Sequence, residues 1–219
     1  LDQRFGIPPT LIEFTTLHSR DLSAYNVIIL ANGSPTEPLS PAALPKLKEW
    51  VENGGTLITT GSAYKLTNKA KITDFKTLSQ GKKKEKVEGN AHIEYKPYHD
   101  TSKAKSGIEG VIFNCHLDIT SPLGYGYENP NVAIMKNGTT VMDFSQIKGS
   151  SPMQYTKQPY LSGCVSLENI KRISNAPASI VSECGKGNVI WFADDLNYRS
   201  YWFGGTKIFM NAIYFGQLY

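Results

Sequence analysis

The sequence predicts an α/β fold, a three-layer sandwich with a mostly parallel sheet and antiparallel additions late in the chain. Three observations lead to this prediction. A strand, helix, strand pattern with short loops occupies residues 24–60. Two glycine-turned hairpin patterns follow at residues 131–144 and 178–194, and an amphipathic helix pattern occupies residues 206–217. We expect a single domain over residues 1–219.

The first pattern indicates a right-handed βαβ unit. Residues 24–33 are nearly all apolar, which is typical of a strand buried on both faces of a parallel sheet. A helix is expected over residues 40–55, with Ser40 as its N-cap and Pro41 in the first position. Its apolar residues fall on one face and glycines end it. A second strand is expected over residues 56–60. The apolar residues of the helix are Leu44, Leu47, Trp50 and Val51.

Other segments are expected to complete the fold. Residues 9–14 and 110–119 have the composition of strands. The hairpin over residues 131–144 is expected to turn at Asn137-Gly138, and the hairpin over residues 178–194 at residues 185–187. Residues 67–107 are polar and rich in lysine, so we expect an insertion there that carries short strands, such as one over residues 91–98. Residues 1–8 are typical of the end of a helix, so we expect a fragment of a longer protein.

Composition excludes several function classes. Apolar residues make up 40% of the chain and charged residues 19%, as in ordinary globular proteins. No apolar run is long enough to span a membrane, so no membrane partner is expected. The net charge is +4, and much of the excess lies in residues 81–89. That run contains no aromatic residues for stacking on bases. We therefore interpret it as a solvated loop and expect no nucleic-acid partner.

Metal and disulfide chemistry have little support in the sequence. The cysteines, Cys115, Cys164 and Cys184, are far apart and form no CxxC pair. The sequence is compatible both with one disulfide and with three free thiols. The histidines lie at positions 18, 92, 99 and 116, and none begins an H-x-x-E or H-E-x-x-H motif. We therefore expect no metal site and no cofactor in this fragment.

A turn with the form of a nucleophile elbow follows the strand at residues 56–60. It reads Gly61-Ser62-Ala63. Such an elbow exposes the side chain at its tip. The sequence suggests Ala63 as the tip residue, and alanine has no nucleophile. Ser62 is adjacent, but a shift of one residue should turn its side chain away. Because no histidine follows residue 116 to act as a base, we predict no catalytic residue.

The best candidate for a ligand surface lies at the predicted strand ends. The segment at residues 192–206 combines carboxylates, an arginine and aromatic rings, which could bind a sugar or a peptide. The alternative is that these side chains only fix the loop and pack on the core. The proposed ligand-binding residues are Ser62, Tyr125, Asp195, Asn197, Arg199 and Trp202.

Several segments together resemble a known family. They are residues 1–14, 21–34, 47–63 (LKEWVENGGTLITTGSA), 121–127 (SPLGYGY) and 163–213, and the last carries the resemblance best. The chain is similar to the C-terminal domain of large bacterial zinc carboxypeptidase-like proteins, the metallocarboxypeptidase A-like family. The resemblance implies a flavodoxin-like fold, similar to class I glutamine amidotransferases. It covers most of the chain except residues 67–107.

The resemblance implies a secreted or periplasmic parent protein, with zinc in a peptidase domain that precedes Leu1. This fragment would be a non-catalytic accessory domain that packs on its own N-terminal peptidase domain or binds a peptide or glycan. Amidotransferases of this class carry a cysteine at the elbow, where we expect Ala63, and a late histidine that this chain lacks. Two alternatives stay open. One is a carbohydrate-binding module, and the other is a degenerate amidotransferase or serine hydrolase that uses Ser62.

Overall fold

The computed structural model describes residues 1–33, 42–78, 106–143, 145, 149–200 and 202–219. Its centre is a sheet of four strands in the order β1-β2-β7-β6. β1 (Val27–Leu30), β2 (Thr56–Thr60) and β7 (Gly187–Phe192) are parallel, and β6 (Ser179–Cys184) is antiparallel to β7. The expected mostly parallel sheet with antiparallel additions is confirmed.

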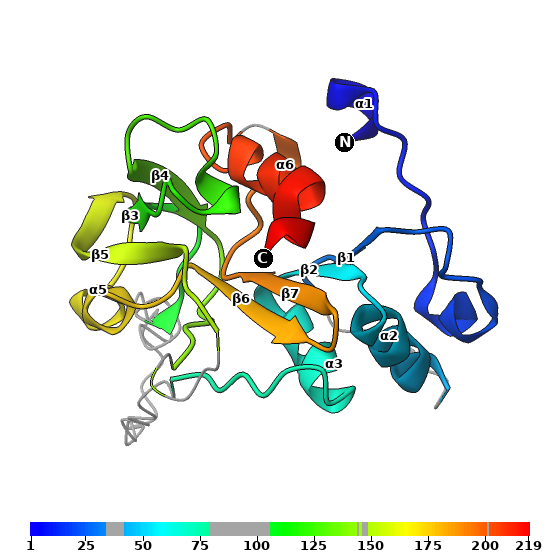
Figure 1. Cartoon of the computed structure of the whole chain (residues 1–219). Helices are drawn as coiled ribbons and strands as arrows, with labels where there is room; N and C mark the ends of the chain where they lie inside the picture. Colours follow the sequence, from blue (N-terminus) through cyan, green and yellow to red (C-terminus); the bar gives the residue numbers. More distant parts are fainter. Residues whose placement is uncertain (34–41, 79–105, 144, 146–148, 201) are drawn as a thin grey trace, which may run out of the picture.

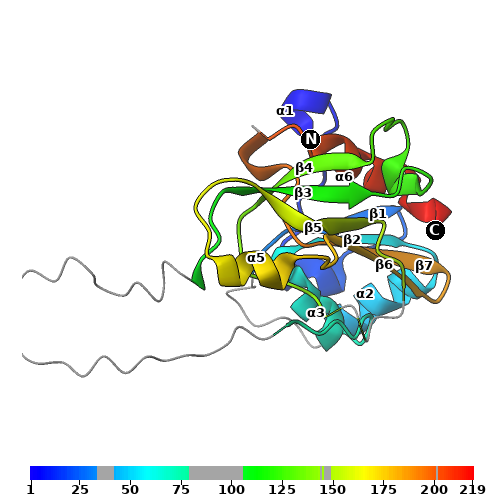
Figure 2. The ribbon, with the colours of Figure 1, turned by 90° about the vertical axis from the view of Figure 1, so that its left-hand side faces the viewer.

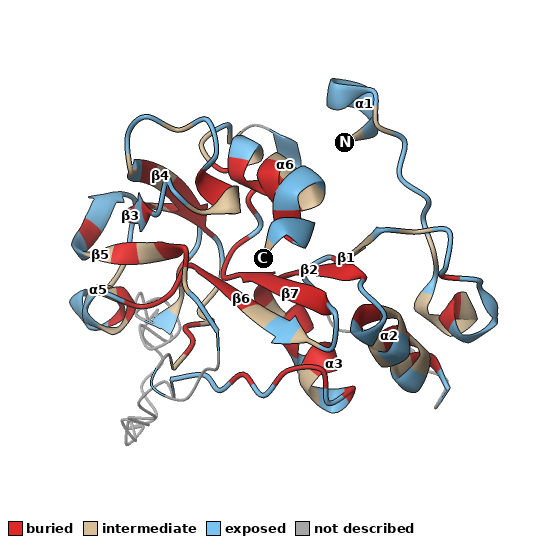
Figure 3. Cartoon of the chain, in the orientation of Figure 1, coloured by how far each residue is buried: buried red, intermediate tan, exposed pale blue. Residues whose placement is uncertain are grey.

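Helices cover both faces of this sheet (Figures 1 and 2). α2 (Ala43–Glu52) and α3 (Tyr64–Lys69) lie on one face, and α6 (Thr206–Phe215) lies on the other. The strands supply apolar residues to both layers, because successive side chains point to opposite faces. Leu57 packs with the core on the α2 side, whereas its neighbour Ile58 packs with the core that includes α6. Figure 3 shows β2 and β7 buried along their whole length.

A second sheet stands beside α6 on the same side of the parallel sheet (Figure 2). It has three antiparallel strands in the order β4-β3-β5: β4 (Asn131–Lys136), β3 (Val111–Leu117) and β5 (Met153–Ser162). Single bridges from Ser150 to Val181 and from Gln154 to Pro177 connect the end of this sheet to β6. α5 (Leu167–Ile173) packs beside β5.

Short helices fill the connections. α1 (Asp2–Phe5) is a single turn that ends at Gly6 in the left-handed conformation. The 3-10 helices are η1 (Phe14–Ser19), η2 (Gly61–Ala63), η3 (Pro122–Gly124), η5 (Tyr198–Ser200) and η6 (Gly216–Leu218). The single helical turn at the start of the chain agrees with the pattern in residues 1–8.

The predicted βαβ unit, the hairpin of β6 and β7 and the last helix are all confirmed. The α2 helix begins at Ala43, and Ser40 and Pro41 lie outside the described residues. Burial of the first strand is less complete than expected. Three of its four residues are only partly buried, because β1 is the first strand in the order and, among the described strands, pairs with β2 alone.

Two expected strand arrangements are wrong. Residues 9–13 form no strand, since Pro8 and Pro9 lack backbone N–H groups and the Leu11 side chain is 89% exposed. The chain after β4 does not fold back on it as a hairpin. Instead β4 pairs with β3, and Met142 bridges to Thr77. Long-range packing replaces the local pairing that the turn sequence suggests.

The first part of the expected polar insertion contributes to the core. Within residues 67–78, Ile72 is buried and Phe75 lies edge-on to Trp191, with 6.4 Å between ring centroids. The expected short strand at residues 91–98 and the lysine-rich run at residues 81–89 lie outside the described residues.

Candidate functional site

The turn after β2 has the left-handed backbone of a nucleophile elbow, but at a different residue from the one expected. Gly61 has φ of 52°, in the left-handed region that only glycine adopts without cost. An elbow places its nucleophile on such a strained strand-to-helix turn. The assignment of the tip to Ala63 is therefore wrong. The Ala63 side chain is 1% exposed and packs in the core on the α2 side.

The side chain of Asn32 fills the space in front of Gly61. A Cβ atom at Gly61 would stand 2.5 Å from Asn32 Oδ1, so a side chain there would require Asn32 to move. The same oxygen accepts the Ser62 backbone N–H at 2.9 Å and the Ser62 hydroxyl at 2.9 Å. Asn32 follows β1, and Gly61 follows its parallel neighbour β2. One carboxamide therefore joins two strand ends and closes the elbow.

Trp191 fixes the elbow from the other side. Its indole N–H donates to the Gly61 carbonyl oxygen at 2.9 Å, and its side chain is fully buried in β7. The Gly61 backbone is therefore held by β7 while its open side faces Asn32. The position of the turn is therefore fixed by contacts from both neighbouring strand ends.

A buried ion pair lies where β7 ends. Asp194 Oδ1 stands 3.0 Å from Lys136 Nζ, and the Tyr155 hydroxyl donates to Asp194 Oδ2. Lys136 is the last residue of β4, and Tyr155 belongs to β5. The cluster therefore ties the second sheet to the end of β7. The sequence places Asp194 in the polar loop, but its side chain lies in the interior, and the pattern gives no sign of its two partners.

The environment of this cluster suppresses ionisation of its neighbours. Burial raises the pKa of the Tyr155 hydroxyl well above its ordinary value, and the charge of Asp194 raises it further. Burial and Asp194 raise the pKa of the Cys115 thiol in the same way. Tyr155 is therefore a stable donor, and Cys115 is a protonated and unreactive thiol.

The loop after Asp194 divides into exposed and packed residues. Asp195 is exposed, and its Oδ1 accepts the Asn197 N–H at 3.2 Å. The Asn197 Oδ1 atom is buried, and no donor from the described part of the chain reaches it. Trp202 is half-buried, and its indole N–H donates to the Ala133 carbonyl oxygen at 3.1 Å. Trp202 thus fits the packing alternative better than an open sugar platform.

Arg199 is exposed and held in a strained turn. It and Ser200 both have left-handed backbones, with φ of 49° and 56°. The Arg199 guanidinium lies 5.2 Å from the ring centroid of Tyr198. Arg4 of α1 stabilises the turn, because its Nη1 donates to the Ser200 carbonyl oxygen at 2.8 Å. The same guanidinium stacks 3.9 Å from the ring centroid of Phe203.

Tyr125 lies away from the rest of the expected site. Its ring contacts Phe215, the last residue of α6, at 5.6 Å between centroids. Gly216, the next residue, lies against Thr56, the first residue of β2. Ser62 lies beyond the other end of the same strand, which ends at Thr60. The structure therefore does not bring Tyr125 next to Ser62, although both are proposed as ligand-binding residues.

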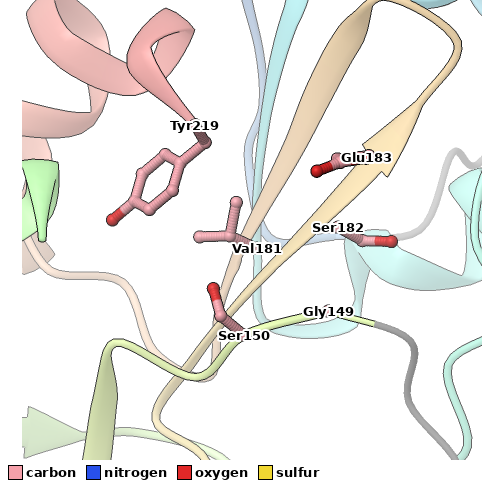
Figure 4. Close-up of a pocket in the computed structure, with 6 residues that line it drawn as sticks. All are labelled: Gly149, Ser150, Val181, Ser182, Glu183 and Tyr219. Carbon is pink, nitrogen blue, oxygen red and sulfur yellow. The ribbon is translucent and has the colours of Figure 1, made fainter.

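A pocket of about 510 Å³ lies elsewhere, along β6 (Figure 4). None of the residues predicted as site residues lines it. The Tyr219 hydroxyl is already used, because it accepts the Leu123 backbone N–H at 3.2 Å. The lining residues are Gly149, Ser150, Val181, Ser182, Glu183 and Tyr219.

The histidines and cysteines that the structure describes form no cluster. His18 and His116 are exposed, while His92 and His99 lie outside the described residues. Over the described ranges, no three acidic, histidine or cysteine side chains are grouped to hold a metal ion. The three cysteines are free, and Cys115 is the buried one. None of the described helices is both long and apolar enough to cross a membrane.

Comparison with known proteins shows the fold. No family model matches the chain. No curated protein matches it. A ThuA-like protein from Bacteroides uniformis has 12% identity and a TM-score of 0.53, over 92% of this chain and 73% of that one. A cytoplasmic protein of Salmonella typhimurium has 16% identity and a TM-score of 0.50, over 89% and 72%. A ThuA-like protein from Parabacteroides merdae has 12% identity and a TM-score of 0.50, over 85% and 65%.

The chain has the class I glutamine amidotransferase-like fold. The expected flavodoxin-like sandwich is thereby confirmed. At these sequence identities the similarity shows the fold alone and gives no information about activity.

Proposed function

We propose that this chain is a non-catalytic accessory domain of an exported zinc carboxypeptidase-like protein. It packs on the peptidase domain of that protein and presents a ligand surface where the parallel strands end. The observation that carries the proposal is the elbow. The residue with the left-handed backbone there is Gly61, which has no side chain, and Asn32 occupies the space that a nucleophile would need.

The chemistry of Ser62 supports the same reading. A serine nucleophile needs a base that takes its proton, usually a histidine. The Ser62 hydroxyl instead donates to Asn32 Oδ1 at 2.9 Å, and an amide oxygen is not a base at neutral pH. Its other neighbour is the Gly33 carbonyl oxygen at 3.4 Å. Nothing in this arrangement activates the hydroxyl.

Exposed aromatic surface supports the packing part of the proposal. Tyr125 and Phe215 are in ring contact, yet they are 40% and 37% exposed. Leu218 in the following turn is 58% exposed. Partly exposed aromatic side chains that contact one another are typical of surfaces that bind another protein.

A serine-reactive fluorophosphonate tests the non-catalytic assignment. The purified chain should not be labelled, and the Ser62→Ala variant should give the same signal as the wild type. Labelling of the wild type that is lost in Ser62→Ala would establish a serine hydrolase and overturn the proposal.

The proposed parent is tested on the full gene product. The coding sequence upstream of Leu1 should contain an H-x-x-E segment and a later histidine, and the intact protein should hold zinc. With such a domain produced separately, Phe215→Asp should weaken its association with this chain. An upstream sequence without those ligands would overturn the assignment to a carboxypeptidase-like parent.

A further inference from the structure

We infer that the Ser62 backbone N–H and hydroxyl form a receptor for a carbonyl or carboxylate oxygen, and that the Asn32 carboxamide is its resident occupant. The inference rests on the proposed function, because it gives the ligand surface a chemical class. A ligand that carries a small carboxylate or carboxamide would enter by displacing Asn32.

The two donors converge on one point. The Ser62 N–H and the Ser62 Oγ are each 2.9 Å from the same Asn32 Oδ1 atom. In elbow enzymes, the backbone N–H of the residue after the strained one helps to bind the oxyanion. Ser62 is the residue after Gly61, so its N–H holds that position. The donor pair is in place even though the reacting side chain is not.

The missing side chain of Gly61 creates the room for this contact. A Cβ there would stand 2.5 Å from Oδ1 and 2.6 Å from the Asn32 side-chain carbon, so the carboxamide lies directly against the glycine. The backbone that would carry a nucleophile therefore forms a wall of the receptor. A ligand oxygen that replaces Oδ1 needs no further opening of the turn.

Asn32 is able to leave. The residue is exposed at the end of β1, so its carboxamide can rotate into water and recover hydrogen bonds there. The exchange of one amide oxygen for another is close to neutral. A carboxylate would gain more, because hydrogen bonds to an ionised acceptor are about twice as strong as neutral ones. The receptor thus favours an acceptor that is stronger than its own side chain.

An NMR titration tests the inference. The ¹H–¹⁵N resonance of Ser62 is followed in the wild type and in Asn32→Ala, with acetate, acetamide or sodium chloride added in separate series. In Asn32→Ala, acetate should shift the Ser62 resonance saturably. Half-saturation should need about tenfold less acetate than in the wild type, because the internal competitor is gone. Saturation by acetate alone assigns a carboxylate ligand. Saturation by acetamide as well assigns a class that includes both carboxylates and carboxamides.

Three results would overturn the inference. These are an unshifted Ser62 resonance in folded Asn32→Ala, equal half-saturation in both proteins, and an equal shift with sodium chloride. If Asn32→Ala does not fold, amide hydrogen exchange in the wild type decides. The Ser62 amide should exchange at least about tenfold more slowly than a free amide, and exchange at the free rate would overturn the contact. Fluorophosphonate labelling is independent of all these outcomes, so the proposed function and this inference can fail separately.

Discussion

Lys136 Nζ lies 3.0 Å from Asp194 Oδ1, and the two side chains are only 0% and 2% exposed. The pair joins the last residue of β4 to a residue just beyond β7, so it connects the two sheets at the edge where the candidate loop begins. Tyr155 supplies a hydrogen bond to the other carboxylate oxygen. A buried carboxylate with both oxygens satisfied is stable, but the loss of one partner leaves a charge without compensation.

Lys136→Met should therefore destabilise the fold strongly. It retains the length of the side chain but leaves the Asp194 carboxylate buried without its cation. We expect a loss of about 3–5 kcal/mol in the free energy of unfolding, measured by urea denaturation.

A surface pair in the same chain gives the matched control. Lys48 lies 3.5 Å from Glu52 on α2, with side chains 34% and 46% exposed. Lys48→Met should cost no more than about 0.5 kcal/mol. Equal losses of unfolding free energy in the two variants would show that burial does not explain the contribution of the Lys136–Asp194 pair to stability.

Tyr155→Phe should cost less than the loss of the lysine. It removes a hydrogen bond to a charged acceptor but retains the ring, which lies edge-on to Phe113 at 5.8 Å between centroids. A bond of this kind contributes about 1.5–3 kcal/mol. Urea denaturation of Tyr155→Phe should give a loss in this range, and a loss below about 0.5 kcal/mol would contradict the hydrogen bond.

Stability should fall at alkaline pH. Burial and the Asp194 charge raise the pKa values of Cys115 and Tyr155 in the folded state. In the unfolded chain the thiol ionises near pH ~8.5 and the hydroxyl near pH ~10, so above these values the unfolded state holds fewer protons than the folded state. Stability is therefore complete below pH ~8.5 and falls by up to about 1.4 kcal/mol per pH unit for each group.

The thiol contribution can be separated from the others. Urea denaturation from pH 7 to 10 should show a shallower alkaline decline in Cys115→Ala than in the wild type. Cys164 is exposed, so Cys164→Ala is the matched control and should follow the wild-type slope. Identical slopes in all three proteins would contradict a role for the buried thiol.

The parts of the fold that follow local rules could be predicted from the sequence. The β6–β7 hairpin turns through Gly185, whose φ of 63° a side chain would resist, and glycine is visible in the sequence. β5 is not predicted, because Pro159 and several exposed residues interrupt its pattern and its partner β3 lies far away in the chain. The start of α5 could have been predicted from its N-cap, because the Ser166 hydroxyl oxygen accepts the Asn169 backbone N–H at 3.2 Å.

The site was only partly predictable for the same reason. The sequence predicts the strand ends after β1, β2 and β7, since apolar runs end visibly before Asn32, Gly61 and Asp194. The residue that closes the elbow could not be predicted, because Asn32 and Gly61 meet only when β1 and β2 pair. Lys136 gave no signal either, since a lysine at a strand end usually faces water.

Gly61→Ala should destabilise the chain by more than the backbone conformation alone explains. A left-handed alanine costs about 1–2 kcal/mol. Its Cβ must also displace the exposed Asn32 carboxamide, and the loss of the two hydrogen bonds from Ser62 adds about 1–3 kcal/mol. Gly110 is the matched control, because its φ is 66° and nothing lies within 4 Å of a Cβ there. In thermal or urea unfolding, Gly110→Ala should show the first cost only, and equal losses would mean that Asn32 does not fill the elbow.

Gly61→Ala should cost less in the Asn32→Gly background. Asn32→Gly leaves room for the new Cβ and has already removed the hydrogen bonds from Ser62, so Gly61→Ala should then show only the left-handed backbone cost, about 1–3 kcal/mol less than in the wild type. A double-mutant cycle measures this coupling directly, and it should be favourable by at least about 1 kcal/mol. Strict additivity of the two changes would show that the carboxamide stands clear of Gly61, and the closed elbow would then have to be abandoned.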